Sequence, residues 1–473
     1  MPNETRYILK RIVLIHPNYR NTYKYVSKSV PLLQPPMGIA YIAAALREKS
    51  HLVSIIDGAP FDLDNREIAK RAIAFSPDLI GISATTNLIE TAAEIAYELK
   101  NRSEVPIVIG GSHSSIMPEK TLEEFPSFDM AVKGEGEYVM LDLCEGIEKN
   151  KISGLTYKES NKIIKNIDRS PIEVLDKLPF PARDLLPNKK YWTPGTGRYP
   201  YANILTSRGC PYSCTFCSDH LIHGRKFRAR SVENVMQEVD FLVREYHIKE
   251  LNIIDDNFTL IPERVEKFCN ELLKRKYNLI WRISQGVRPD KVTKDLLKLM
   301  KKSGCYFIAF GIESGDDEIL KIMKKRLTTE QIKRAVNWTR ELGIHTFGFF
   351  IIGNLGENRK KIEKTINFAK ELKLDDAQFL LCLPFPGTEI YDRVIKEGKL
   401  LIKRWQNYAA FDSPTFTHKE LTPELLKEMQ IEAYRSYYLR PKIIVKKIFE
   451  IKSIKQLLAY FMAGLGILKM KKR

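Results

Sequence analysis

The sequence predicts an α/β protein with a doubly wound, five-stranded parallel sheet, an open barrel of six strand–helix units and a helical C-terminal region. Two observations predict this fold class. Short apolar runs alternate with helical patterns along most of the chain, and one stretch rich in Pro, Gly and aromatic residues interrupts the alternation. The length of 473 residues, with 44% hydrophobic and 28% charged residues, suits two or three globular domains.

Five apolar runs predict the strands of the first sheet, and helical patterns follow them near 38–49, 65–75, 87–101, 118–124 and 137–149. The strand runs are 11–16, 52–57, 78–83, 105–110 and 128–132. Such sheets bind ligands at the carboxyl ends of their strands. The residues expected at those ends include Gly110, Gly111, Gly134, Glu135 and Gly136. Glycine there allows close approach of a ligand, although simple tight turns explain these positions equally well.

Six further runs predict the barrel, at 203–207, 251–255, 280–283, 306–311, 345–352 and 377–383. One barrel helix is marked clearly at 329–342, with Thr328 as N-cap, Gln331 three residues later and Gly343 as its end. The pattern fits a partial (β/α)6 barrel, similar to a TIM barrel, with chemistry at the carboxyl ends of the strands. The expected domains are therefore 8–150, a linker with a small hairpin at 151–199, the barrel at 200–390 and the helical region at 391–473.

Charge and cysteine content exclude several classes of protein. The net charge is +18, but residues 440–473 hold ten Lys or Arg and one Glu, so half of the excess lies in the last 34 residues. This placement disfavours nucleic acid as a partner. The seven cysteines are too unevenly placed for a disulfide framework, the chain opens with a polar segment, and no apolar run reaches membrane-spanning length. We therefore expect a cytoplasmic protein.

Three cysteines lie close together in the loop after the first predicted barrel strand: Cys210, Cys214 and Cys217. Structural zinc usually has four ligands, and His220 or His223 could supply the fourth, although the spacing is unlike that of a zinc ribbon or finger. Three thiolates on a four-iron cluster leave one iron open to a small molecule. The missing fourth cysteine therefore indicates an iron–sulfur centre that acts on a ligand.

The spacing Cys-x3-Cys-x2-Cys, with the aromatic Phe216 before the last cysteine, resembles the signature of the radical S-adenosylmethionine superfamily. Further segments recur in the order typical of that family: IIDDNF, GIESG, GFFIIGNLGE and LPFPGTEIYD. The resemblance implies that the three cysteines hold a 4Fe–4S cluster. It also implies contacts to S-adenosylmethionine from Asp255, Asp256, Glu313, Gly353 and Gly356. Taken singly, the aspartates could be an N-cap pair, and Glu313 and Gly353 simple turn residues.

The N-terminal domain resembles the Rossmann-like, cobalamin-binding domain found in one branch of that superfamily. The matching segments are PPMGIAYIAAAL, GGSHSSIMPE and KGEGE. The resemblance implies cobalamin contacts from Thr85, Thr86, Gly110, Gly111, His113, Gly134, Glu135 and Gly136. No Asp-x-His-x-x-Gly motif marks a lower cobalt ligand, and we expect His113 to bond to backbone rather than to cobalt. The two threonines could instead cap the next helix.

The resemblance implies an enzyme that reductively cleaves S-adenosylmethionine to a 5′-deoxyadenosyl radical and, with cobalamin, methylates an unactivated carbon of a small molecule. Ring closure or rearrangement stays open as an alternative. A donor such as flavodoxin or ferredoxin would supply the electron. A tRNA-modifying enzyme that inserts sulfur is disfavoured because the N-terminal domain has only Cys144. A cobalamin sensor is disfavoured because it has no use for an open iron.

The C-terminal region predicts an amphipathic helix at 421–441, a second helix in which Lys442, Lys446 and Lys447 oppose an apolar group, and an apolar segment with a basic end. Basic residues beside an apolar helical face suggest peripheral contact with an anionic membrane. A lipid or isoprenoid substrate would then be favoured. The alternative is a helix that packs over the barrel with solvated lysines.

Overall fold

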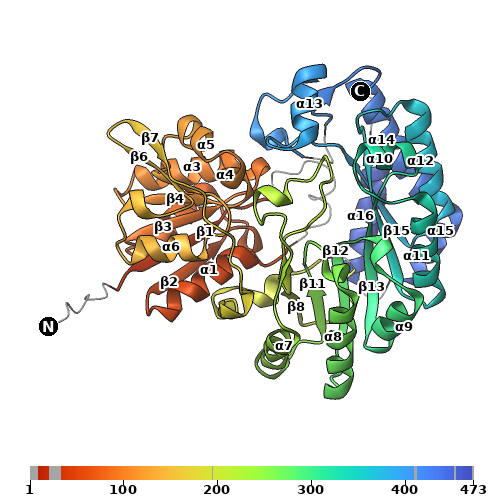
Figure 1. The fold of residues 1–473 in the computed structure, drawn as a ribbon, viewed down its shortest axis with the longest axis horizontal. Coiled ribbons are helices and arrows are strands. Elements are labelled where there is room, and N and C mark those ends of the chain that lie inside the picture. Colours follow the sequence, from red (N-terminus) through yellow and green to blue (C-terminus); the bar gives the residue numbers. More distant parts are fainter. Residues whose placement is uncertain (1–8, 21–32, 194, 410–412, 452–453, 471–473) are drawn as a thin grey trace.

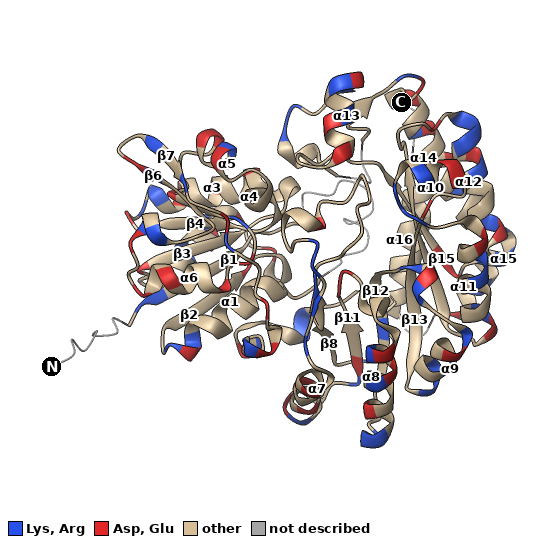
Figure 2. Cartoon of the chain, in the orientation of Figure 1, with Lys and Arg blue, Asp and Glu red and all other residues tan. Residues whose placement is uncertain are grey.

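The computed structural model describes residues 9–20, 33–193, 195–409, 413–451 and 454–470. Two α/β units lie side by side, and the helices after the barrel pack against the second unit (Figure 1). Basic and acidic residues are interspersed along outer helices such as α8, α11 and α12 (Figure 2).

The first sheet has the predicted five parallel strands in the order β2-β1-β3-β4-β5. The strands are β1 Arg11–His16, β2 Leu52–Asp57, β3 Leu79–Ser83, β4 Ile107–Gly110 and β5 Met130–Val132. Alternate residues of β1 enter two different cores: Val13 and Ile15 one, and Ile12 and Leu14 the other. Both faces of the sheet are thus buried, which confirms the doubly wound arrangement.

Helices cover both faces of this sheet. On one face lie α1 Met37–Glu48 and α6 Glu137–Cys144, and on the other α2 Asn65–Ala74, α3 Ile89–Lys100 and α5 Pro118–Glu124. A short helix, α4 Ser112–Ile116, follows the fourth strand, where the sequence indicated only a turn. The last helix ends at Cys144, several residues earlier than its sequence pattern suggested.

The predicted hairpin forms β6 Leu155–Glu159 and β7 Lys162–Lys165, joined by Ser160 and Asn161 with positive φ. It is not an isolated element within a linker, because β6 pairs antiparallel with β5 and extends the sheet to seven strands. Leu155 and Tyr157 are buried in the same core as α1 and α6. The hairpin therefore covers an edge of the sheet that would otherwise be open.

The second sheet has six parallel strands in chain order, and β8 and β15 lie at its two ends. The strands are β8 Tyr201–Ile204, β11 Glu250–Ile253, β12 Ile280–Val287, β13 Cys305–Glu313, β14 His345–Ile352 and β15 Asp376–Leu381. Between them lie α7 Val232–Tyr246, α8 Pro262–Arg275, α9 Lys294–Lys302, α10 Asp317–Ile322, α11 Thr329–Glu341 and α12 Arg359–Glu371. This is the predicted partial barrel.

The capping signals of α11 are also confirmed. The Thr328 side chain accepts a hydrogen bond from the Gln331 amide, and the Gln331 side chain accepts one from the Thr328 amide. Gly343 has a φ of 65°, which suits the left-handed conformation after a helix end.

Four helices follow the barrel: α13 Glu389–Glu397, α14 Pro423–Tyr438, α15 Pro441–Phe449 and α16 Ile454–Lys469. Two short antiparallel strands, β16 Lys399–Leu400 and β17 Phe416–Thr417, connect the first two. Helix α14 packs on α12 and β15 through buried Leu426, Met429 and Tyr437. None of the described helices combines the length and apolarity that a bilayer crossing requires.

Lys446 and Lys447 of α15 are paired with carboxylates, whereas Lys442 is exposed, so the sequence alternative of solvated lysines holds only for Lys442. Lys446 pairs with Asp375, and Lys447 lies 2.7 Å from Asp376 and 2.8 Å from Glu450. Asp375 and Asp376 lie at the amino end of β15. The paired lysines therefore tether α15 to that end of the barrel and leave the apolar face of the helix outward. The last residues of the basic end, 471–473, lie outside the described residues.

Candidate active site

The three clustered cysteines lie in the loop after β8 and the short strand β9 Ser207–Arg208, which places them at the carboxyl end of the barrel strands. All seven cysteines are free thiols, but only Cys210, Cys214 and Cys217 are partly exposed. Burial raises the pKa of Cys217 to about 12, so a cationic metal centre would be needed to hold it as a thiolate. Partly exposed thiols without a disulfide partner fit the thiolate donors of an iron–sulfur cluster.

The run that follows β11 holds the cysteine loop in place. Asp255 is 1% exposed, and its carboxylate accepts hydrogen bonds from the Thr206 amide at 2.6 Å and from the Thr206 and Ser207 hydroxyls. Asp256 accepts from the Gly209 amide at 3.0 Å, and Asn257 Nδ2 lies 3.8 Å from Cys210 Sγ. The two aspartates therefore position the segment before Cys210 and do not form a helix N-cap pair. Nothing in these contacts assigns them to S-adenosylmethionine.

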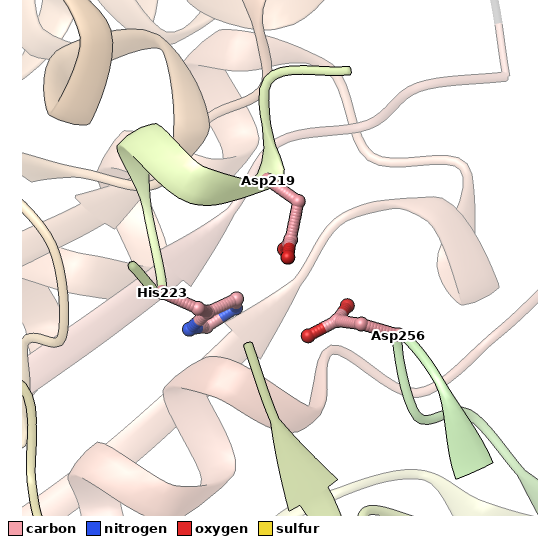
Figure 3. Close-up of side chains that lie close together, drawn as sticks. All are labelled: Asp219, His223 and Asp256. Atoms are coloured by element: carbon pink, nitrogen blue, oxygen red, sulfur yellow. The ribbon is translucent and has the colours of Figure 1, made fainter. Parts of the chain in front are cut away.

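Asp256 also belongs to a second group of polar side chains beside the loop (Figure 3). Ligand atoms of Asp219, His223 and Asp256 lie within 4.8 Å of one another. Burial and the nearby Asp256 carboxylate raise the pKa of Asp219 to about 7. His223 thus gathers with carboxylates, and His220 Nδ1 lies 3.1 Å from the Cys217 carbonyl oxygen. His220 thus has a backbone partner, while His223 Nδ1 lies 3.5 Å from Glu135 Oε1.

Glu313 ends β13 with a φ of 65°, a conformation that is uncommon for residues other than glycine. Its carboxylate accepts a hydrogen bond from Lys325 Nζ at 2.7 Å, and both side chains are 9% exposed, so it is not a solvated turn residue. Burial lowers the pKa of Lys325, but Glu313 and Cys214 raise it overall. A buried ammonium therefore lies close to the cysteine loop.

The glycines after β14 have positive φ, 93° for Gly353 and 87° for Gly356. A side chain at Gly353 would lie 2.9 Å from Leu426, and one at Gly356 would lie 2.6 Å from Ile322. Packing and backbone conformation thus account for both glycines. The amides of Gly353 and Asn354 donate to Glu357, at 2.7 and 2.8 Å, which fixes this turn. Asn257 Oδ1, after β11, and Ser284 Oγ, on β12, are buried polar atoms without a hydrogen-bond partner among the described residues, so they are candidates for contact with a polar ligand.

In the first sheet, the loops after β3 and β4 lie together. A side chain at Gly111, with a φ of 96°, would lie 2.5 Å from the Ala84 carbonyl oxygen, so only glycine fits there. Gly110 is not crowded in this way. Thr85 donates to Asn87 Oδ1 at 2.6 Å and makes no capping bond, while Thr86 is buried.

His113 is 1% exposed, and its Nδ1 atom is buried without a hydrogen-bond partner among the described residues. Our expectation of a side-chain bond to backbone is not met at this atom. An orphaned buried ring nitrogen beside the Gly111 turn, after the carboxyl end of β4, fits a polar ligand such as cobalamin.

The loop after β5 faces the barrel. Glu135 accepts two hydrogen bonds from Arg228, at 3.0 and 2.9 Å, and one from the Ile172 amide at 2.7 Å. Its carboxylate therefore ties the two domains together. Gly134 has a φ of 81° and lies close to the Ile222 carbonyl, while Gly136 packs near Ile42.

A second ion pair strengthens this contact, because Arg208 Nη2 lies 2.6 Å from Glu137 Oε1, and both side chains are 4% exposed. Residues that follow β5 are thus fixed against the segments before Cys210 and after Cys217. Burial raises the pKa of Glu135, but the nearby His223 ring, the hydrogen bonds from Arg228 and the charge of Arg208 hold it well below its usual range.

Sequence reasoning missed Asn257, Lys325 and Trp405. The first directly follows the aspartate pair and could have been suspected, since the motif IIDDNF contains it. Lys325 lies 12 residues beyond its partner Glu313, and no local pattern marks it. Trp405 packs against the N-terminal domain from the far end of the chain, a contact that no sequence signal predicted.

Comparison with protein families matches residues 204–369 to the Radical SAM superfamily and residues 23–143 to the B12 binding domain. An uncharacterized methyltransferase of Pyrococcus horikoshii is 39% identical over 445 residues, which cover 93% of this chain and 95% of that protein. The anaerobic magnesium-protoporphyrin IX monomethyl ester cyclase of Rubrivivax gelatinosus is 29% identical and aligns with 81% of this chain and 70% of its own length.

Among solved structures, the radical S-adenosylmethionine methyltransferase TsrM of Kitasatospora setae, with cobalamin and a 4Fe–4S cluster bound, has a TM-score of 0.73. It covers 98% of this chain and 99% of its own length at 17% identity, so it shares the fold of both domains. The chain therefore belongs to the cobalamin-binding branch of the radical S-adenosylmethionine superfamily, and its cofactors are a 4Fe–4S cluster, S-adenosylmethionine and cobalamin.

Proposed function

We propose that this enzyme methylates an unactivated carbon of a small molecule. The observation that carries the proposal is the contact between the two cofactor-binding regions. The loop after β5 in the cobalamin-binding domain is hydrogen-bonded to Arg228, eleven residues after Cys217. Both sets of strands therefore direct their carboxyl ends toward one interface, where a radical site and a methyl donor can reach the same substrate.

When bound, the cluster supplies the electron that cleaves S-adenosylmethionine, and cobalamin supplies the methyl group. Cys210, Cys214 and Cys217 hold the cluster. Asp255 and Asp256 keep the cysteine loop in register with β11. Gly353, Gly356 and Glu313 shape the ends of the barrel strands, where we propose that S-adenosylmethionine lies. Thr85, Thr86, Gly110, Gly111 and His113 form the crevice for cobalamin.

Product analysis tests the proposal. The enzyme is reconstituted without oxygen with iron, sulfide and cobalamin, and incubated with S-adenosylmethionine, a reductant and an extract of small molecules and lipids. Mass spectrometry then follows 5′-deoxyadenosine and S-adenosylhomocysteine together. We expect both to rise in step with a substrate heavier by roughly 14 Da, the mass of one CH2 per methyl group. Failure of S-adenosylhomocysteine to form while 5′-deoxyadenosine accumulates would contradict methylation.

A radical cyclase or rearrangement enzyme is the second candidate, since one of the similar proteins is named as a cyclase. The same assay separates the two reactions. Ring closure consumes S-adenosylmethionine for the radical alone, so 5′-deoxyadenosine appears without S-adenosylhomocysteine and without a gain of mass.

We further propose that the enzyme is cytoplasmic and rests on the inner face of the membrane through α15 and α16. Phe449 is 84% exposed and Ile454 79% exposed, and further large apolar side chains on the two helices are also exposed. They are Ile444, Val445, Ile448, Leu457, Leu458, Phe461, Met462 and Leu468. An outward apolar face of this kind, near the basic end of the chain, suits an anionic bilayer surface.

Contact with a membrane favours a lipid or isoprenoid substrate. The tether of α15 lies at the amino end of β15, whereas the cysteines lie at the carboxyl ends of the barrel strands. The membrane contact therefore lies away from the cysteine loop and does not form part of the active site. Its role would be to keep the enzyme close to a substrate that is dissolved in the membrane. The electron is proposed to come from a small carrier such as flavodoxin or ferredoxin.

A further inference from the structure

A segment of the C-terminal region, residues 401–409, reaches back to the cobalamin-binding domain, and we call it the strap. Two carboxylates hold it there. Arg404 donates to Glu90 Oε2 through Nε and Nη2, at 2.9 and 2.6 Å, and the Trp405 amide donates to Glu90 Oε1 at 2.7 Å. The indole N–H of Trp405 donates to Glu124 Oε2 at 2.5 Å. The strap is thus fixed to both α3 and α5.

These two helices follow the loops of the cobalamin crevice. Helix α3 comes after Thr85 and Thr86, and α5 comes after Gly111 and His113. Trp405 is bonded to α3 through its backbone amide and to α5 through its indole N–H, so the residue is held in a fixed position relative to both loops.

The ring of Trp405 meets the ring of His113 edge to face. Their centroids are 4.9 Å apart and their planes are inclined by 71°. Tyr408 stacks on Trp405 with a centroid distance of 5.5 Å, and Phe385, from the loop after β15, stacks on Tyr408 at the same distance. A row of aromatic rings therefore runs from the loop after β15 to His113. Aromatic pairs of this geometry attract each other, and the attraction depends on their orientation.

His113 is the member of this row that has no hydrogen-bond partner for its buried Nδ1 atom among the described residues. Burial, with the charge of Lys120, lowers the pKa of His113 to about 4. The imidazole is neutral near pH 7, so it carries one N–H donor and one acceptor nitrogen. Cobalamin has amide side chains and a nucleotide tail, and these polar groups can pair with such a nitrogen.

We propose that Trp405 is a positioning residue that holds the His113 ring so that its nitrogen hydrogen-bonds to the polar periphery of bound cobalamin. The C-terminal region thus completes the cobalamin site, although the B12 binding domain match ends at residue 143. The inference rests on the cobalamin assignment of the proposed function and adds a contact from outside that domain.

Cobalamin binding to the full chain tests this role. Hydroxocobalamin affinity is measured by equilibrium dialysis for the wild type, Trp405→Leu, Trp405→Phe, His113→Ala and the double variant of Trp405→Leu with His113→Ala. Trp338→Phe, on α11, is the matched control. We expect roughly tenfold weaker binding for Trp405→Leu and His113→Ala, and a smaller loss for Trp405→Phe, because phenylalanine keeps an aromatic contact. The control should bind as the wild type does.

The double variant shows whether Trp405 affects cobalamin binding through His113 or independently of it. If Trp405 acts through His113, the double variant binds no more weakly than His113→Ala alone, whereas independent effects would add. Iron content and the absorbance of the reconstituted cluster should be the same in every variant, because the strap does not contact the cysteines. Leucine is apolar but much smaller than tryptophan, so melting of the cofactor-free chain checks that each variant is folded.

Three results would overturn the inference. Wild-type affinity in both Trp405→Leu and Trp405→Phe would remove Trp405 from the site. Additive losses in the double variant would show that it does not act through His113. A wild-type chain that forms its cluster but binds no cobalamin would remove the cobalamin part of the proposed function as well, and this result is distinguishable from the other two.

Discussion

The roles of individual residues around the cysteine loop could be predicted from the sequence to different extents. Cys210, Cys214 and Cys217 were singled out because the predicted cluster site rests on their spacing alone. The segment that contains Asp255 and Asp256 was singled out from the sequence. The hydrogen-bond partners of the two aspartates lie 47 to 49 residues away in the chain, so their positioning role is not visible in the local sequence. The partner of Asn257 is 47 residues away, and that of Lys325 is 12 residues away with no local pattern to mark it. A metal-ligand spacing can be recognised within one short segment of a sequence, whereas a hydrogen bond between distant segments can be recognised only in the folded structure.

Glu357 carries a prediction at this scale. Its carboxylate is 6% exposed, and burial raises its pKa to about 7 despite hydrogen bonds from Gly353 and Asn354. Because the folded pKa lies above the unfolded value, this group stabilises the fold fully below about pH 4.5, and the contribution is lost as the pH rises through about 7. Glutamine stays neutral throughout. We expect Glu357→Gln to gain up to about 3 kcal/mol relative to wild type between pH 5 and pH 8.

Urea unfolding of the cofactor-free chain at several pH values measures this difference. Glu263→Gln, which replaces an exposed glutamate in the first turn of α8, is the matched control. Its unfolding free energy should stay within about 0.5 kcal/mol of the wild-type value at every pH. If the difference in unfolding free energy between Glu357→Gln and wild type did not change between pH 5 and pH 8, the pKa of Glu357 would not be raised by folding.

At the scale of elements, most strands and helices were predicted from apolar periodicity, and the α11 cap was predicted residue by residue. The hairpin of β6 and β7 was found, but its pairing with β5 was not, because the sequence carries no mark of which strand edge it joins. Helix α4, with five residues, is too short for periodicity to detect. For α15 the amphipathic pattern was right, but the lysines face barrel carboxylates, which only the fold places opposite them.

The outward face of α15 and α16 predicts binding to anionic vesicles. Wild type should sediment with phosphatidylglycerol vesicles, and a chain truncated after Leu439 should not. Phe449→Ser should weaken binding roughly tenfold, since it removes most of one buried aromatic side chain from the bilayer contact. Ile167→Ser, which removes an apolar side chain that is 78% exposed on the first domain, should bind as wild type does. Equal pelleting of wild type and the truncated chain would contradict the membrane contact.

At the scale of the whole molecule, two domains and an additional helical region were predicted, but not how they meet. The contacts between domains involve single residues far apart in sequence: Arg228 with Glu135, Arg208 with Glu137, and the strap with Glu90 and Glu124. Several of these side chains are almost fully buried, and breaking one such ion pair typically costs about 3–5 kcal/mol. The placement of the first domain against the cysteine loop therefore depends on contacts that no single segment encodes.

The most direct test of the whole account measures the cluster and its reaction in one preparation. Wild type, Cys214→Ala and the matched control Cys144→Ala are reconstituted without oxygen, and bound iron and 5′-deoxyadenosine formation are measured with S-adenosylmethionine and a reductant. We predict about four iron atoms per chain and 5′-deoxyadenosine for the wild type and for Cys144→Ala, and a loss of both for Cys214→Ala. Equal iron content and equal 5′-deoxyadenosine formation in Cys214→Ala and wild type would contradict a radical-generating cluster on these three cysteines.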